Sequence, residues 1–327
     1  MSLSDAAAPL VFLGSNDVAA RCLEVLAARL PVGLVITPPA RRRGRGKPPT
    51  PTPVGAAAAA LSLEVLETAD VNAPEELARL QALGPSLLVV VAFGQILRKA
   101  VRGSARHGGI NLHFSLLPRW RGAAPVQRAL LAGDEQTGVA VQRLHRRLDA
   151  GALLALVREP IGPEDDSPRL LARLTEIGAP LLADVAERIV RDNPPPETEQ
   201  DEDAVTQAPR IEKSEGRLDF ATESAAQICR RVRAFGDWPG CRFELPNLSG
   251  ERTIVRVRRA VESEESAGSG EPGTVLSADG AGVVIAAHTG AVCIAELQRA
   301  GARALPAGDF LNGWPVASGA RVSLPSD

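Results

Sequence analysis

Short apolar runs alternate with helical patterns over the first part of the chain. The runs fall at 9–14, 32–36, 63–66 and 86–92, and apolar residues recur at helical spacing in the segments that follow them. The helices are expected to begin after Asn16, to end near Leu61, and to span 75–83 and 95–101. Continuous apolar strands between helices are typical of a parallel sheet covered on both faces. The pattern therefore predicts a Rossmann-like, doubly wound α/β domain with a mostly parallel sheet.

A different pattern follows a segment at 193–204 that is rich in proline and acidic residues, a composition typical of linkers. Beyond it lie a helical pattern at 222–235 and short strand patterns at 241–245, 252–261, 273–277, 282–287 and 292–298. Several short strands with glycine and proline turns predict a small β-barrel or sandwich. We therefore expect a first domain over 1–192, a linker over 193–212 and a second domain over 213–327.

One connection in the first domain is unusually long. Residues 37–54 are rich in proline, glycine and arginine, so we expect an exposed, mobile loop without regular structure. Its cations can meet phosphates closely and order on contact, and they are Arg41, Arg42, Arg43, Arg45 and Lys47. A solvated insertion without a role is the alternative.

Composition limits the classes of function that the chain can serve. With 37 Lys and Arg against 39 Asp and Glu, the formal net charge of −2 argues against coating of nucleic acid by bulk electrostatics. Local basic patches remain compatible with it, such as the arginines that alternate along 252–258 and those at 230–233. Four cysteines without C-x-x-C spacing predict neither a zinc site nor a redox motif. No apolar run approaches the roughly 18 residues of a membrane helix and no signal segment is visible, so we expect a cytoplasmic protein.

The segment 109–118 carries the first chemical signal. Because side chains alternate along a strand, Asn111 and His113 are predicted to point to the same face. Open α/β folds bind ligands at the carboxyl ends of their strands, where an amide can donate to an oxyanion and an imidazole can carry a proton. A structural hydrogen-bonded pair is the alternative for a pattern of only two residues.

A carboxylate on a glycine-containing turn completes this set. Asp149 follows the apolar segment 138–144 and could approach His113 from a neighbouring strand end, where it would stabilise an imidazolium. On spacing alone, an Asx turn is the simpler account of Asp149. An oxyanion donor, a proton carrier and a carboxylate, with no serine or cysteine nucleophile, suit direct acyl transfer to an amine.

Longer motifs around these residues resemble the folate-dependent formyltransferases. The shared pieces are Asn111-Leu-His113, Ser115-Leu-Leu-Pro-Arg-Trp-Arg-Gly-Ala-Ala-Pro125, Gly133-Asp134, Thr137-Gly138, Leu148-Asp149-x-Gly151 and Phe93-Gly-Gln-Ile-Leu97. The 115–125 run is similar in particular to that of family members that act on a charged tRNA, and the similarity extends over almost the whole chain. The resemblance implies a Rossmann-like formyltransferase domain, without a metal, followed by an OB-like barrel that contacts tRNA.

The resemblance also implies a reaction of translation initiation. A formyl group would pass from 10-formyltetrahydrofolate to the α-amino group of methionine on initiator methionyl-tRNA. Asn111 and His113 would stabilise the tetrahedral oxyanion, and His113 with Asp149 would handle the amine proton. The folate would be bound by Ser115, Leu116, Leu117, Pro118, Phe93, Gly94, Gln95, Ile96 and Leu97. The cations at 41–47 would enter the groove of the tRNA acceptor stem, and the chain would act as a monomer.

Two rival reactions remain open on sequence grounds. The same three residues would serve a formyltransferase that acts on a nucleotide-linked amino sugar, although the arginine-rich loop and the second domain argue against it. A hydrolase that releases formate from 10-formyltetrahydrofolate would use water in place of the amine. A dinucleotide-dependent dehydrogenase is disfavoured because Gly14-Ser-Asn-Asp-Val18 lacks the GxGxxG spacing. Phe114 departs from the small residue or proline usual in the family, and it could narrow the pocket or point into the core.

Overall fold

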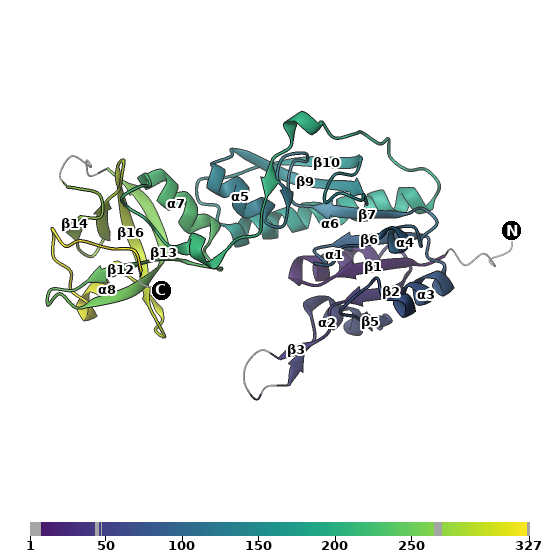
Figure 1. The fold of residues 1–327 in the computed structure, drawn as a ribbon, viewed down its shortest axis with the longest axis horizontal. Helices are drawn as coiled ribbons and strands as arrows, with labels where there is room; N and C mark the ends of the chain where they lie inside the picture. Colours follow the sequence, from purple (N-terminus) through teal and green to yellow (C-terminus); the bar gives the residue numbers. More distant parts are fainter. Residues whose placement is uncertain (1–7, 43–45, 47, 265–269, 326–327) are drawn as a thin grey trace. The chain divides into compact units, whose positions relative to one another are not determined.

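The computed structural model describes residues 8–42, 46, 48–264 and 270–325, which form two compact units (Figure 1). Unit 1 comprises the described residues within Met1–Pro125, Gln136–Pro160 and Leu171–Ala208. Unit 2 comprises those within Val126–Glu135, Ile161–Leu170 and Pro209–Asp327. Two short excursions of the first half of the chain, 126–135 and 161–170, thus belong to the second unit.

A seven-stranded sheet with the order β10-β9-β7-β6-β1-β2-β5 forms the centre of unit 1. Its parallel strands are β1 (Leu10–Gly14), β2 (Val32–Thr37), β5 (Val65–Glu67), β6 (Leu87–Val91) and β7 (Gly109–His113). At one edge, β9 (Gln136–Arg143) pairs antiparallel with β7 and with β10 (Leu153–Pro160). Strands β1 and β6 are buried along their whole length, as strands covered on both faces should be. The predicted doubly wound, mostly parallel sheet is confirmed.

Helices cover both faces of this sheet (Figure 1). One face carries α3 (Pro74–Leu83) and α4 (Lys99–Arg102), and the other carries α1 (Asp17–Ala27), α2 (Pro53–Ala60) and α6 (Ser167–Val190). On the first face Val11 of β1 and Leu80 of α3 belong to one buried cluster. On the second face Gly178 lets α6 lie close to the sheet, because a Cβ there would meet Leu112 at 3.0 Å. Leu112 therefore faces α6, which leaves its neighbours Asn111 and His113 on the opposite side of β7.

The helix expected over 95–101 is shorter than predicted. It begins only at Lys99, since the preceding residues form an irregular turn in which Gly94 has a φ of +81°. The amide of Gln95 bridges two backbone groups of another segment: its Oε1 accepts from the Val71 N–H at 2.8 Å, and its Nε2 donates to the Thr68 carbonyl at 3.0 Å. The side chain of Asn72 binds backbone groups of the turn itself: its Nδ2 donates to the Ile96 carbonyl at 2.9 Å and its Oδ1 accepts the Arg98 N–H at 2.7 Å. Side-chain bonds of this kind compete with the helical backbone and delay the start of the helix.

The long connection after β2 contains regular structure that its composition did not suggest. β3 (Arg41–Arg42) pairs antiparallel with β4 (Pro49–Thr50), and we call this pair the arginine hairpin. The prediction of a loop without regular structure is therefore wrong for these residues. Proline favours extended backbone in the residue before it but offers no N–H, which accounts for a ladder of only two residues on each strand. The hairpin projects from the body of unit 1 (Figure 1), and Arg43, Arg45 and Lys47 lie outside the described residues.

Unit 2 is built on an antiparallel sheet with the order β12-β13-β16-β15-β14, and β17 pairs with β16. The strands are β12 (Cys241–Pro246), β13 (Arg252–Ser263), β14 (Val275–Ala278), β15 (Val283–Ala286), β16 (Ala291–Arg299) and β17 (Ala304–Pro306). The helices of the unit include α7 (Ala225–Ala234), which packs on β13, and α8 (Ala307–Gly313), together with α5 (Pro125–Ala132) from the excursion at 126–135. The predicted small barrel is confirmed as a curved, half-barrel sheet of the OB-like kind.

The last segment of the chain joins the two edges of this sheet. Val275 of β14 donates its N–H to the carbonyl of Ala320 at 2.8 Å, and Glu244 of β12 donates its N–H to the carbonyl of Ser323 at 2.9 Å. A strand edge with unpaired backbone groups is a site for unwanted association, and closure removes it. Residues 319–323 therefore close the sheet of unit 2, as a further strand does in a closed barrel.

Candidate active site

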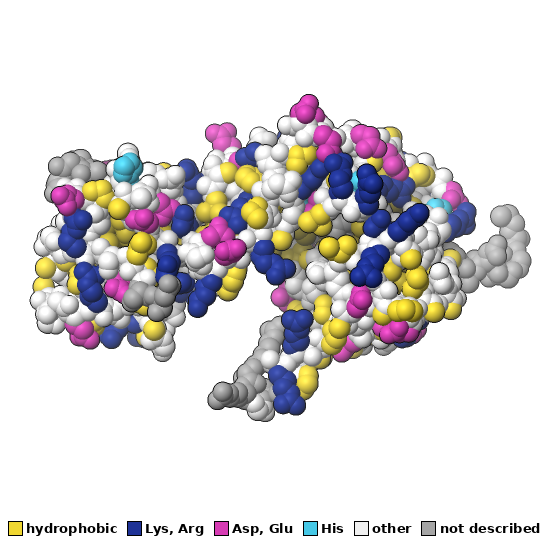
Figure 2. All heavy atoms as spheres, in the orientation of Figure 1, with side chains coloured by type: hydrophobic (Ala, Val, Ile, Leu, Met, Phe, Trp, Pro, Cys, Tyr) yellow, Lys and Arg dark blue, Asp and Glu magenta, His cyan; other side chains and the backbone are white. Residues whose placement is uncertain are grey.

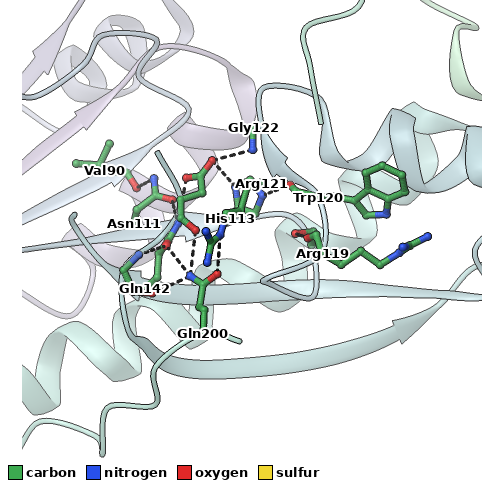
Figure 3. Close-up of polar contacts among 12 residues, drawn as sticks. Val90, Asn111, His113, Arg119, Trp120, Arg121, Gly122, Gln142 and Gln200 are labelled. Carbon is green, nitrogen blue, oxygen red and sulfur yellow. Dashed lines mark hydrogen bonds and ion pairs between the residues drawn. The ribbon is translucent and has the colours of Figure 1, made fainter. Parts of the chain in front are cut away.

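Asn111 and His113 lie at the carboxyl end of β7, on the same face of the strand (Figure 3). The period of two along a strand predicted this arrangement, and the neighbouring β6 places the Val90 carbonyl next to Asn111. The carboxyl ends of parallel strands are where open α/β folds bind ligands. The two residues thus lie at the edge of the sheet where such folds bind their ligands.

The amide of Asn111 is fixed in one orientation. Its Nδ2 donates to the Val90 carbonyl at 3.1 Å, and its Oδ1 accepts from Nε2 of Gln142 at 3.4 Å. A carboxamide nitrogen has two N–H groups, and the second one of Asn111 makes no hydrogen bond to any residue that the structure describes. Since the side chain is only partly buried, this N–H can be offered to a ligand oxygen.

The imidazole of His113 has a partner at each nitrogen and is only 6% exposed. Its Nε2 lies 2.8 Å from the carbonyl oxygen of Trp120, and since a carbonyl can only accept, Nε2 is the donor. Its Nδ1 lies 3.7 Å from Oδ2 of Asp149, an ion-pair distance that is longer than a hydrogen bond. A proton on Nδ1 therefore faces a carboxylate.

Asp149 is held by groups other than the histidine. Oδ2 accepts the Gly122 N–H at 3.0 Å and Oδ1 accepts from Nε2 of Gln142 at 3.0 Å. The residue has a φ of +50°, a left-handed conformation that Asp tolerates better than most side chains. The N–H of Gly151 donates to Oε1 of Gln142 at 3.2 Å, so an Asx turn within 149–151 is not what positions this carboxylate. The structure thus brings together all three residues that the sequence suggested.

Sequence analysis missed the polar layer behind them. Gln142 on β9 is 2% exposed, and Gln200 is 8% exposed. Nε2 of Gln200 donates to the carbonyls of Asp149 at 3.0 Å and Gly151 at 2.7 Å. Gln200 was missed because its segment has the composition of a linker. The one available signal for Gln142 was an amide inside the apolar run 138–144.

Arg121 is a further buried member of this polar layer and binds Gln200. It is 5% exposed, its Nε donates to Oε1 of Gln200 at 2.9 Å, and its Nη2 donates to Glu202 at 3.0 Å. Hydrogen bonds from Arg121 and from Arg147 lower the pKa of the Glu202 carboxyl. Glu202 therefore stays ionised at neutral pH and supplies a counter-charge to the buried guanidinium. Backbone pairing of β8 (Arg121–Gly122) with β11 (Gln207–Ala208) holds the same strand in place.

Ser115–Pro118, expected to contact the folate, lie in the turn that follows His113 and Phe114. Ser115 is fully buried and its hydroxyl donates to the Arg119 carbonyl at 2.6 Å, while Leu117 is 3% exposed. Their role in binding stays a prediction. Phe114 is 7% exposed, which fits a place in the core.

The other predicted folate segment, 93–97, has one outward-facing apolar side chain. Phe93 and Leu97 are buried, whereas Ile96 is 79% exposed, and Leu148, next to Asp149, is 69% exposed. Exposed large apolar side chains beside a functional residue are typical of surfaces that bind a ligand. The role of this segment also stays a prediction.

The basic residues that the sequence suggested for RNA contact differ in their exposure and in their hydrogen bonds within the protein. Arg41 and Arg42 are exposed on the arginine hairpin, whereas Arg256 and Arg258 of β13 donate to the carbonyl of Gly236 within unit 2. Burial and the nearby Arg258 lower the pKa of Arg256. Lysine and arginine side chains are spread among acidic and apolar side chains over the face shown in Figure 2.

Two further observations concern the described residues alone. They contain no group of three or more His, Cys, Asp or Glu side chains arranged to hold a metal ion. None of their helices is both long and apolar enough to cross a membrane.

Sequence comparison identifies the same two parts in the family models. The model described as formyl transferase matches residues 11–186, and the model described as formyl transferase, C-terminal domain, matches residues 210–315. Proteins named methionyl-tRNA formyltransferase are similar along nearly their full length. One from Dechloromonas aromatica is 39% identical, with 97% of this chain and 99% of the relative covered, and one from Ruegeria pomeroyi is 42% identical, with 96% and 99% covered.

Solved structures with the same fold include HypX from Aquifex aeolicus in complex with tetrahydrofolic acid, with a TM-score of 0.62 and 20% identity. The match covers 95% of this chain and 49% of HypX, so the chain spans about half the length of that protein. An N-formyltransferase from Helicobacter canadensis in complex with folinic acid and dTDP-3-aminofucose has a TM-score of 0.62 at 16% identity, over 89% of this chain and 98% of that one. The matching family models and the near-full-length relatives together show that the chain belongs to the methionyl-tRNA formyltransferase family of formyl transferases.

Proposed function

We propose that the protein transfers a formyl group from 10-formyltetrahydrofolate to the α-amino group of methionine on initiator methionyl-tRNA. The observation that carries the proposal is the convergence of Asn111, His113 and Asp149 at the end of β7, in a chain whose relatives over nearly its whole length are named for this reaction. We further propose 1–192 as the catalytic domain, 193–212 as a linker and 213–327 as a tRNA-binding domain, in a cytoplasmic monomer.

The chemistry requires charge stabilisation rather than a protein nucleophile. The methionine amine attacks the formyl carbon, and the carbonyl oxygen becomes an oxyanion. The unpaired N–H of Asn111 donates to that oxygen, and a protonated His113 facing Asp149 supplies positive charge beside it. The bond from the formyl carbon to N10 of the folate then breaks as N10 takes up the Nδ1 proton of His113. The imidazole, now neutral, accepts the amine proton beside the Asp149 carboxylate.

The folate would lie against the two segments predicted for it. Ile96 offers an exposed apolar side chain on the first, and Leu148 offers another beside Asp149. A planar, largely apolar ring system is the kind of ligand that such side chains cover. We therefore assign the donor to 93–97, 115–118 and the turn that carries Asp149.

The tRNA would be contacted by both units. The arginine hairpin presents Arg41 and Arg42 to solvent, and we assign Arg43, Arg45 and Lys47 to the same contact. Unit 2 has a hollow beside β12, β13 and β16 that is lined by Arg242, Arg256 and Arg299 and by no acidic side chain among the described residues. Basic hollows on OB-like barrels are suited to a nucleic-acid backbone.

A four-arm assay tests this function. Purified protein is given 10-formyltetrahydrofolate with charged initiator tRNA, with charged elongator tRNA, or with no acceptor, and both formyl transfer and formate release are followed. We expect rapid formylation of the methionine on initiator tRNA and little formate. Formate release without any acceptor would instead support a hydrolase. A fourth arm offers a nucleotide-linked amino sugar, the class of molecule bound in the Helicobacter canadensis structure, and formylation of that sugar in place of the tRNA would overturn the proposal.

A further inference from the structure

Gln142 is a buried amide that contacts both Asn111 and Asp149. It lies directly opposite Asn111 in the antiparallel pairing of β7 and β9 and is 2% exposed. Its Nε2 donates to Oδ1 of Asp149 at 3.0 Å and to Oδ1 of Asn111 at 3.4 Å (Figure 3). One side chain therefore links the oxyanion donor to the carboxylate.

The direction in which this amide points is set by donors that cannot be reversed. A guanidinium has no acceptor, so Arg121 requires the oxygen of the Gln200 amide at Oε1 and thereby turns Nε2 of Gln200 inward. The N–H of Gly151, at 3.2 Å, then requires an oxygen at Oε1 of Gln142, and the inward-turned Nε2 of Gln200, at 3.3 Å, also faces that oxygen. Its nitrogen consequently faces Asp149 and Asn111.

The same donor and acceptor argument fixes the orientation of the Asn111 amide. Because Nε2 of Gln142 is a donor, the atom of Asn111 that faces it must be the oxygen, and the nitrogen of Asn111 must face the Val90 carbonyl. A reversed Asn111 amide would place its nitrogen against Nε2 of Gln142 and its oxygen against the Val90 carbonyl. It would also withdraw the N–H that the oxyanion needs.

We propose that Gln142 is a positioning residue for formyl transfer: it holds the Asn111 amide in the orientation that offers an N–H to the oxyanion and keeps the Asp149 carboxylate in place beside His113. This inference rests on the proposed function. Gln142 acts through its two neighbours and is not placed in contact with the substrate. A buried polar network of this kind is rigid only when each member is satisfied, so loss of one amide loosens the groups that it orients.

The first test compares Gln142→Met with the wild type under saturating folate and charged tRNA. We expect kcat to fall roughly 10- to 100-fold, as small misplacements of reacting groups cost, while the KM of each substrate stays within about threefold. The matched control is Thr137→Val on the same strand. Thr137 is 2% exposed and its hydroxyl has no hydrogen-bond partner among the described residues, so this variant should keep the wild-type kcat.

A second variant, Gln142→Glu, separates positioning from packing. The shape is retained, but an ionised carboxylate opposes Asp149 and cannot donate to the Asn111 oxygen. We expect a loss of kcat that becomes smaller towards acidic pH, where the new carboxyl is protonated and can donate. A purely structural role would give a loss that does not vary in this way. If the Met variant fails to fold, the pH dependence of the Glu variant still decides the matter.

A double-mutant cycle then asks whether the effect passes through Asn111. In an Asn111→Ala background, Gln142→Met should lower kcat by a smaller factor than in the wild-type background, because the Asn111 amide is absent and only the contact with Asp149 is lost. Wild-type kcat in a folded Gln142→Met protein, or an equal loss in both backgrounds, would overturn the proposal. Failure of the wild-type protein to formylate the tRNA would refute the proposed function instead, so the two failures are distinguishable.

Discussion

The carboxylate of Asp149 lies 3.7 Å from Nδ1 of His113 and is held there by groups other than the imidazole. The backbone N–H of Gly122 and the amide of Gln142 each donate to one of its oxygens. The negative charge is thus in place before any proton moves, which is the arrangement that stabilises charge without reorganisation during the reaction. Substitutions can distinguish the contribution of the ion pair from that of the two hydrogen bonds.

Replacing Asp149 with Asn removes the charge and retains the shape. Asn tolerates the left-handed φ of this residue, so we expect the free energy of unfolding to change by no more than about 1–2 kcal/mol. Without the carboxylate, a positive charge on His113 loses its partner, and kcat should fall about 100-fold or more. Single-turnover rates with thermal unfolding as the control would measure both effects. Asp149→Asn with wild-type turnover would exclude a role for this charge.

Removal of the Asn111 amide tests the oxyanion donor. Asn111→Ala should lower kcat by at least about 100-fold with little change in the KM of either substrate, since the donor acts mainly when charge develops on the oxygen. Asn111→Asp has nearly the same shape but presents oxygen in place of the N–H. A comparable loss in both variants identifies the N–H as the active group. Retention of activity in Asn111→Asp would contradict its assignment.

Gly151 is required by the close approach of two backbone segments behind Asp149. A Cβ on this residue would lie 1.9 Å from the Arg143 carbonyl oxygen, and backbone atoms cannot rotate away as a flexible side chain can. We expect Gly151→Ala to cost about 1–3 kcal/mol in unfolding free energy, measured by denaturant titration. It should lower kcat as well, because the turn that carries Asp149 must shift. Gly280→Ala is the control, since a Cβ at that position would meet nothing within 4 Å, and equal stability of the two variants would contradict the prediction.

Sequence reasoning succeeded where the structure is set by local periodicity. The alternation of side chains along β7 placed Asn111 and His113 on one face, and the apolar runs located the parallel strands. It failed where the structure of a segment depends on a contact with residues distant in the sequence. Gln200 enters the site from a segment that has the composition of a linker, and the side chain of Asn72 binds the backbone of Ile96 and Arg98 and delays a helix.

The closure of unit 2 shows the same limit. Residues 319–323 join β12 and β14, which are distant from each other in sequence. The composition of this segment does not predict the pairing. The arginine hairpin likewise depends on pairing of Arg41 and Arg42 with residues across the turn. Proline and glycine content predicts the connection but does not predict which residues on its two sides will pair.

The cysteines give a prediction about reactivity. Burial raises the pKa of Cys22, Cys229 and Cys241 to about 12, whereas Cys293 is only half-buried. Near about pH 8, a thiol with that pKa is ionised on the order of one part in 10⁴, and the thiolate is the reactive form. We expect a thiol reagent to modify the native protein at Cys293 alone and all four cysteines after unfolding. Cys293→Ser should abolish the native reaction, and rapid native modification of Cys22 would contradict this account.

The same shifts have a consequence for stability at alkaline pH. The three buried thiols have a folded-state pKa of about 12, above the unfolded value of 9.0, so the unfolded chain gives up these protons first. Their contribution to stability is therefore complete below about pH 9 and is lost as the pH rises from there towards 12. Denaturant midpoints measured across this range should fall. A Cys22→Ala variant should show a shallower fall than the wild type, and an identical slope would argue against the burial of this thiol.

The arginine hairpin should matter for one substrate only. Arg41 and Arg42 are exposed on β3, so replacing both with Ala should leave the fold and the KM for the folate unchanged. If each arginine binds one phosphate, the KM for tRNA should rise, and the slope of its dependence on salt should decrease by about one for each arginine replaced. Arg191→Ala is the matched control, an exposed arginine at the end of α6 that is ion-paired with Glu187 at 2.6 Å. Equal changes in the KM for folate and for tRNA, or an equal effect of Arg191→Ala, would contradict specific binding of the tRNA by this hairpin.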